Sequence, residues 1–152
     1  MAVYALTDQT AVEALGRRVA LRLRTGDSVC LFGPLGAGKS TLARALIRAL
    51  AGEATEVPSP TFTLVQIYDG PDFPIAHFDL YRLRTAEEAF ELGLDDAQND
   101  GATIIEWPER LDDALPADRL EIHLAIGESD TQRIVRIEAF GAWFGRDRFD
   151  HD

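Results

Sequence analysis

A glycine-rich stretch holds the only lysine of the chain and has the spacing of a phosphate-binding loop. Residues 33–40 read Gly-Pro-Leu-Gly-Ala-Gly-Lys-Ser, which matches the pattern G-x-x-x-x-G-K-[ST]. Glycines at these positions let backbone N–H groups turn inward around an anion, and the lysine reaches the β- and γ-phosphates as a compact charge. The pattern predicts a nucleoside triphosphate site. Its expected cradle consists of Gly33, Gly36, Ala37, Gly38 and Lys39.

Two hydroxyl side chains follow the lysine. Ser40 stands where the motif supplies a hydroxyl to Mg²⁺, which bridges the terminal phosphate oxygens. Thr41 is expected to donate toward the α-phosphate, although it also suits the ordinary first turn of a helix. ATP and Mg²⁺ are therefore the expected ligand and cofactor.

A site of this kind needs a further carboxylate near the metal, normally at the end of a strand. Asp79 lies in the predicted strand at residues 75–81, where strand alternation puts it on the same face as His77 and Tyr81. Glu106 directly follows Ile104-Ile105. We expect Asp79 and Glu106 to ligate the metal or to orient an attacking water. The alternatives are a strand-end turn, a solvated glutamate and a hydrogen-bonded core histidine.

Two further segments flank the predicted site. Pro108 should keep Trp107 extended, so that the strand does not turn into a helix, and the indole is either a packing residue or a partner contact. In Ser59-Pro60-Thr61-Phe62, the Thr61 hydroxyl is free to sense a γ-phosphate or its metal; a plain turn is the alternative.

The elements that must position these residues alternate between helices and strands. Strand, glycine loop and helix occur in the order that the motif requires. We therefore predict an α/β fold of the P-loop NTPase type, with three layers and a mixed sheet that contains antiparallel hairpins. The expected elements are a helix at 8–24, a strand at 28–32, a helix that ends before Gly52, a hairpin of 61–68 with 75–81, a short helix opened by Thr85, a strand at 102–105 and a hairpin of 120–126 with 133–140.

Length and composition set outer limits. The 152 residues fit a single domain, with a polar tail at about 145–152 that we expect to be frayed. The net charge is −11, and the densest basic group (Arg17, Arg18, Arg22 and Arg24) is expected to be a solvated helix face. Direct binding of nucleic acid usually needs a basic stripe, so any action on RNA is expected to require a partner.

The compartment is predicted from what the sequence lacks. Cys30 is the single cysteine, and we expect it to be a buried small hydrophobe in a reducing compartment. The first ten residues do not resemble a signal peptide, and no apolar run approaches the ~20 residues of a membrane span. The expectation is a cytoplasmic protein that is monomeric alone.

Four ordered motifs resemble one family. The TsaE family, bacterial ATPases of tRNA threonylcarbamoyladenosine biosynthesis, pairs the phosphate loop with Ser-Pro-Thr-[Phe/Tyr], His-x-Asp-x-Tyr-Arg and [Ile/Val]-Glu-Trp segments. The resemblance runs from about residue 6 to residue 140, and its motifs stand here at Leu35 to Ser40, Ser59 to Phe62, His77 to Arg82 and Ile105 to Trp107. Two departures are Pro34, where the family usually has an acidic residue, and Ser40, where threonine is more frequent.

The resemblance implies a role beside other proteins. It implies an ATPase that docks on the TsaD–TsaB pair, reaches tRNA only through these partners, and is slow alone. It also implicates Thr7 and Gln9 in nucleotide binding. Two other functions stay open: a small-molecule or nucleotide kinase using the same loop, and a nucleotide-gated binding module without meaningful hydrolysis.

Overall fold

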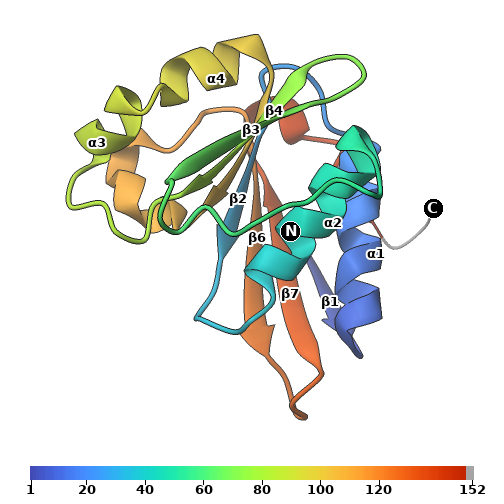
Figure 1. Ribbon diagram of the computed structural model, residues 1–152. Helices are drawn as coiled ribbons and strands as arrows, with labels where there is room; N and C mark the ends of the chain where they lie inside the picture. Colours follow the sequence, from blue (N-terminus) through green and yellow to red (C-terminus); the bar gives the residue numbers. More distant parts are fainter. Residues whose placement is uncertain (150–152) are drawn as a thin grey trace.

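A mixed β-sheet forms the centre of the molecule. The computed structural model describes residues 1–149, and within them seven strands lie in the order β1-β7-β6-β2-β5-β4-β3 (Figure 1). Strands β4, β5, β2 and β6 run parallel, while β3 and β7 add antiparallel hairpin partners and β1 pairs antiparallel with β7. The strands are β1 (Ala2–Leu6), β2 (Ser28–Phe32), β3 (Val65–Asp69), β4 (Pro74–Asp79), β5 (Ala102–Glu106), β6 (Arg119–Ile126) and β7 (Arg133–Ala139).

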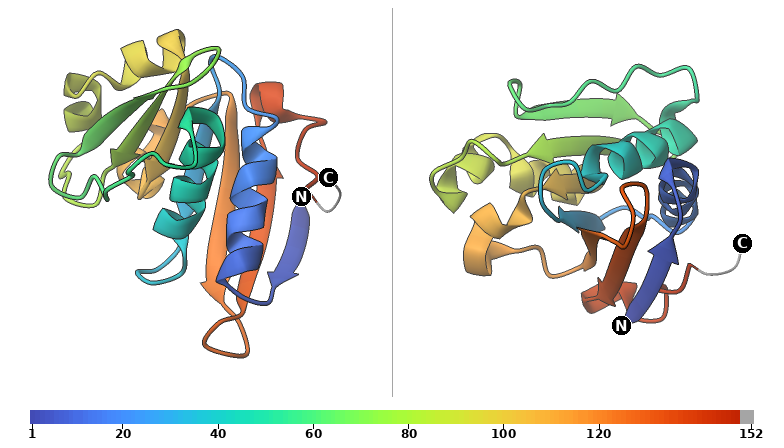
Figure 2. Two further views of the ribbon diagram at one scale, coloured as in Figure 1. Left: turned by 45° about the vertical axis from the view of Figure 1, so that its right-hand side comes forward. Right: turned by 90° about the horizontal axis from the view of Figure 1, so that it is seen from below.

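Helices cover the two faces of the sheet unequally. α1 and α2 lie together on one face, and α3, α4 and the short helix η1 lie on the other, beside β4 and β5 (Figures 1 and 2). Each face therefore has its own apolar core, and the three-layer α/β prediction is confirmed. The helices are α1 (Gln9–Ala20), α2 (Lys39–Ala51), α3 (Ala86–Glu91), α4 (Leu94–Asp100), η1 (Pro108–Ala114) and η2 (Gly141–Trp143).

Most predicted elements are present, with shifted ends. Both hairpins form, although β3 begins only at Val65 because residues 60–63 make a turn. α1 ends at Ala20 rather than at residue 24. The sequence prediction missed β1, α4, η1 and η2, since each is short and is held mainly by tertiary contacts. Cys30 is fully buried as expected, and burial raises the pKa of its thiol, which keeps it inert.

The backbone at Trp107 contradicts the extended conformation predicted from Pro108. Trp107 has φ 58° and ψ 48°, in the left-handed region, and η1 starts directly after it. The indole packs at 4.8 Å from the Tyr81 ring and lies over the Lys39 ammonium. These tertiary contacts offset the local strain of a non-glycine residue in this conformation.

The segment after Gly145 is docked where a frayed tail was predicted. Arg146 forms a double hydrogen bond with the buried Asp27 carboxylate, at 2.9 Å to each oxygen. Phe149 is 1% exposed, and its backbone N–H donates to the Tyr4 hydroxyl. Arg22, just after the end of α1, stacks over the Phe149 ring, so part of the predicted basic group packs against the C-terminal segment instead of facing solvent. Residues 150–152 of the predicted tail lie outside the described part.

Phe149→Ala should lower the free energy of unfolding by about 3 kcal/mol, because it removes a buried aromatic side chain. Phe144, 74% exposed and just before that segment, is the matched control, and Phe144→Ala should change stability by less than about 0.5 kcal/mol. Urea unfolding followed by circular dichroism measures both. Equal stability of the two variants would mean that the C-terminal segment does not contribute to the core.

Candidate nucleotide site

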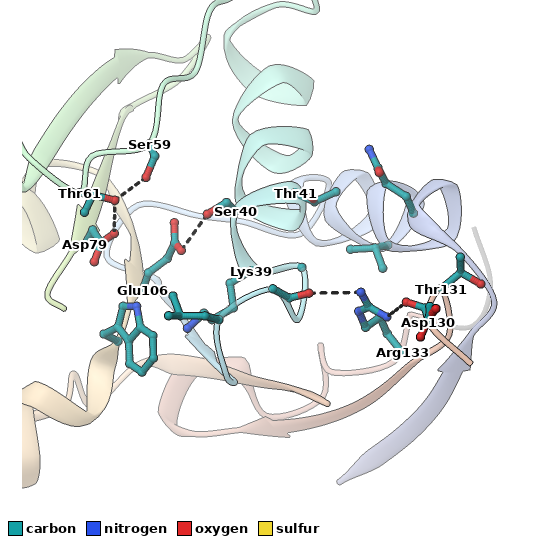
Figure 3. A pocket seen from close by; sticks show the side chains of 16 residues that line it. Lys39, Ser40, Thr41, Ser59, Thr61, Asp79, Glu106, Asp130, Thr131 and Arg133 are labelled. Carbon is teal, nitrogen blue, oxygen red and sulfur yellow. Dashed lines mark hydrogen bonds between the residues drawn. The ribbon is translucent and has the colours of Figure 1, made fainter. Parts of the chain in front are cut away.

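The glycine-rich loop joins β2 to α2 and surrounds the start of that helix (Figure 3). Gly33 has no room for a side chain, since a Cβ there would lie 2.5 Å from the Leu124 carbonyl oxygen. Gly38, with φ +106°, turns the chain in the left-handed region so that α2 begins at Lys39. The unpaired backbone N–H groups of the first turn of α2 then lie at the loop, as an anion-binding site requires.

The Lys39 side chain already has partners within the protein. Its Nζ donates to the Gly33 carbonyl oxygen at 2.6 Å and lies 3.4 Å from the centre of the Trp107 ring. Burial lowers the pKa of the Lys39 ammonium, while the nearby carboxylates, Glu106 first among them, act in the opposite direction. A ligand with several negative charges would stabilise the charged form of Lys39 further, so the position favours an anionic group.

The two predicted carboxylates stand side by side at the ends of parallel strands. Asp79 of β4 and Glu106 of β5 are register partners. Ser40, in the first turn of α2, donates to Glu106 Oε1 at 3.2 Å. Asp79 Oδ2 accepts from Thr61 at 3.2 Å, so the Ser59–Phe62 segment is tied to the strand end. Figure 3 shows these side chains on one side of the loop.

One open pocket of about 530 Å³ collects most of the predicted residues. Gly33 and Ala37 support the loop through their carbonyl oxygens instead of lining the pocket, and Thr7, exposed before α1, does not line it either. The predicted residues that line the pocket are Gln9, Gly36, Gly38, Lys39, Ser40, Thr41, Thr61, Asp79 and Glu106.

The sequence reading missed the contribution of the β6–β7 hairpin. Asp130, Thr131 and Arg133 line the pocket opposite the carboxylates (Figure 3). Arg133 donates to the Ala37 carbonyl oxygen at 3.0 Å and to that of Gly36 at 3.2 Å, which holds the loop from outside. These partners are nearly 100 residues apart in the chain, and an arginine at the start of a strand carries no local signal of such a contact.

The donor set suits a magnesium ion that also binds phosphate. The Ser40 hydroxyl and the two carboxylates of Asp79 and Glu106 are oxygen donors, the type that Mg²⁺ prefers. Within residues 1–149, no group of three or more His, Cys, Asp or Glu side chains is placed to hold a metal alone. Mg²⁺ usually takes one or two carboxylates, with waters and substrate phosphates completing its shell.

Nucleotide should change the fluorescence of Trp107, because a phosphate tail would draw the Lys39 ammonium away from the indole ring. Trp143, the other tryptophan, is fully buried outside the pocket and should not respond. Titration with ATP should therefore change the emission of the wild type and of Trp143→Phe, but not that of Trp107→Phe. A response that persists in Trp107→Phe would contradict the predicted exchange of contacts.

The fold and the pocket define a P-loop NTPase-type α/β protein. The chain belongs to the TsaE family, since the family described as "Threonylcarbamoyl adenosine biosynthesis protein TsaE" matches residues 6–135. The TsaE of Rickettsia bellii is 38% identical over 125 residues, 82% of this chain and 87% of that protein. The TsaE of Streptomyces coelicolor is 42% identical over 127 residues, covering 80% of this chain and 84% of its own length.

A solved structure has the same fold. The crystal structure of Bacillus subtilis YdiB superposes with a TM-score of 0.78 at 27% identity, covering 95% of this chain and 89% of YdiB. The family resemblance predicted from the four motifs is thus confirmed. Among residues 1–149, no helix has the length and apolar character needed to cross a membrane.

Proposed function

We propose that this protein is a Mg²⁺-dependent ATPase that acts with TsaD–TsaB in forming threonylcarbamoyladenosine at A37 of ANN-decoding tRNAs. The main support is one arrangement: Lys39 and Ser40 begin a helix at a glycine-rich loop, and Glu106 and Asp79 face them across one pocket. The membership in the TsaE family supports the pathway.

Each side chain has a stated task in the proposed reaction. Lys39 exchanges its contact with the Gly33 carbonyl oxygen for the β- and γ-phosphates. Ser40 and Glu106 would hold Mg²⁺, which neutralises charge on the phosphate oxygens when it is bound. Asp79 supports the metal or the attacking water, and Thr61, hydrogen-bonded to Asp79, responds to the state of the γ-phosphate.

Partner proteins account for the rest of the proposed role. The net charge of −11 opposes direct binding to a phosphate backbone, so the tRNA is reached through TsaD–TsaB. We infer that the protein is monomeric alone and that its turnover without these partners is slow.

The proposal is tested by measuring phosphate release from ATP with and without Mg²⁺ and with and without TsaD–TsaB. The expected result is slow Mg²⁺-dependent turnover alone, and tRNA modification by TsaD–TsaB that requires this protein and ATP. No hydrolysis under any of these conditions would leave only a nucleotide-gated binding module. Stoichiometric transfer of labelled phosphate to a small acceptor would instead identify a kinase.

A further inference from the structure

A buried histidine stands behind Glu106, outside the pocket. His77 of β4 is 2% exposed and does not line the pocket, so it has no route to a bound nucleotide. Its Nε2 lies 2.7 Å from Glu106 Oε2. Glu106 itself is only 3% exposed. The contact joins neighbouring parallel strands within the sheet and is therefore a fixed feature of the fold.

The two oxygens of Glu106 have different partners. Oε2 faces His77, and Oε1 accepts a hydrogen bond from Ser40 at 3.2 Å. A carboxylate gripped at both oxygens cannot rotate about its last bond without losing one contact. The orientation of Oε1 toward the start of α2 therefore depends on what holds Oε2.

The hydrogen-bonding capacity of the His77 ring is directed to Glu106 alone. The other ring nitrogen, Nδ1, is buried and has no hydrogen-bond partner among the described residues. An ionised carboxylate only accepts, so the N–H of the ring is assigned to Nε2, which donates to Oε2. Burying the Nδ1 atom of His77 without a partner costs free energy, so we look for the role of His77 in its one contact, the one with Glu106.

We propose that His77 is a positioning residue, which holds Glu106 Oε2 so that Oε1 is presented to the pocket beside Ser40. It is the counterpart of the outer-shell groups that orient metal-binding carboxylates, whose loss typically weakens metal affinity by about 10- to 100-fold. For its metal readout the inference rests on the proposed function, and it adds a residue that touches neither nucleotide nor metal.

The test compares His77→Leu, which removes the donor, with His77→Gln, whose amide reaches about as far as Nε2. Calorimetry measures the affinity for ADP in excess chelator and the Mg²⁺ concentration that gives half of the full Mg²⁺ effect on ADP binding. His77→Leu should leave the affinity for ADP in excess chelator within about twofold of the wild type. It should raise the Mg²⁺ concentration that gives half of the full effect by about 10-fold or more. His77→Gln should return that concentration toward the wild-type value.

Two outcomes would overturn the inference: an unchanged Mg²⁺ dependence in His77→Leu, or equal loss in His77→Leu and His77→Gln, which would mean that ring shape alone matters. If His77→Leu does not fold, His77→Asn replaces it, because the asparagine amide reaches only to the Nδ1 position and should show the same loss.

A crystal structure of His77→Leu, grown without nucleotide, tests the inference independently of ligand binding. The Glu106 carboxylate should turn away from Ser40, and an unchanged carboxylate would overturn the positioning role. If the wild type bound no nucleotide at all, the proposed function would fail, yet the carboxylate orientation would still decide for or against His77.

Discussion

Lys39→Ala is expected to weaken ATP binding by about 10- to 100-fold. The variant loses a charged donor to the phosphates, and hydrogen bonds to charged groups contribute about 1.5–3 kcal/mol. Isothermal titration calorimetry measures the affinity directly. Unchanged affinity would contradict the role of Lys39 in the pocket.

Lys39→Arg is the matched variant, because it keeps the charge and changes the shape. The ammonium sits between the Gly33 carbonyl oxygen at 2.6 Å and the Trp107 ring at 3.4 Å, and a planar guanidinium, which spreads its charge over three nitrogens, does not place a compact charge at that point. We expect Lys39→Arg to bind ATP nearly as poorly as Lys39→Ala.

Glu106→Gln is expected to retain ATP binding and to lower turnover by about 100-fold or more, the usual effect of losing a group that supports the attacking water or its metal. The glutamine keeps the size of the side chain and one acceptor oxygen, while its amide nitrogen can no longer accept from Ser40 or His77 at the other position. Steady-state phosphate release and calorimetry on the same sample separate turnover from binding.

Glu109→Gln controls for charge near the lysine. Glu109 is an exposed residue of η1 that does not line the pocket, although its carboxylate also acts on the Lys39 charge. Its loss should change turnover by less than about twofold. Wild-type hydrolysis in Glu106→Gln, or an equal defect in Glu109→Gln, would remove Glu106 from the proposed machinery.

Local pattern was sufficient for the loop and for the strands that end at the carboxylates. The glycine-rich loop is contiguous in sequence, and Glu106 directly follows an apolar run. The strand that holds Asp79 was predicted to run on to residue 81 and ends at Asp79 instead, where parallel pairing of β4 with β5 brings the two carboxylates together. These parts of the site depend on short-range rules that a single sequence displays.

Contacts between distant segments lay beyond that reading. Arg133 reaches the loop only because the β6–β7 hairpin folds back beside it. Trp107 adopts a left-handed backbone because its indole is held by Lys39 and Tyr81, against the preference set by Pro108. The segment after Gly145 is polar in composition, yet one buried phenylalanine and one arginine–aspartate pair dock it.

The occupied state of Lys39 has a consequence for how tightly the protein holds its ligand. A phosphate tail must displace two existing partners, the Gly33 carbonyl and the Trp107 face, before it gains the ammonium. The free energy gained from the contact between Lys39 and phosphate is reduced by the loss of these two contacts. When the ligand leaves, Lys39 can form them again. For the ATPase that we propose, such a site would favour quick release of the nucleotide over long residence.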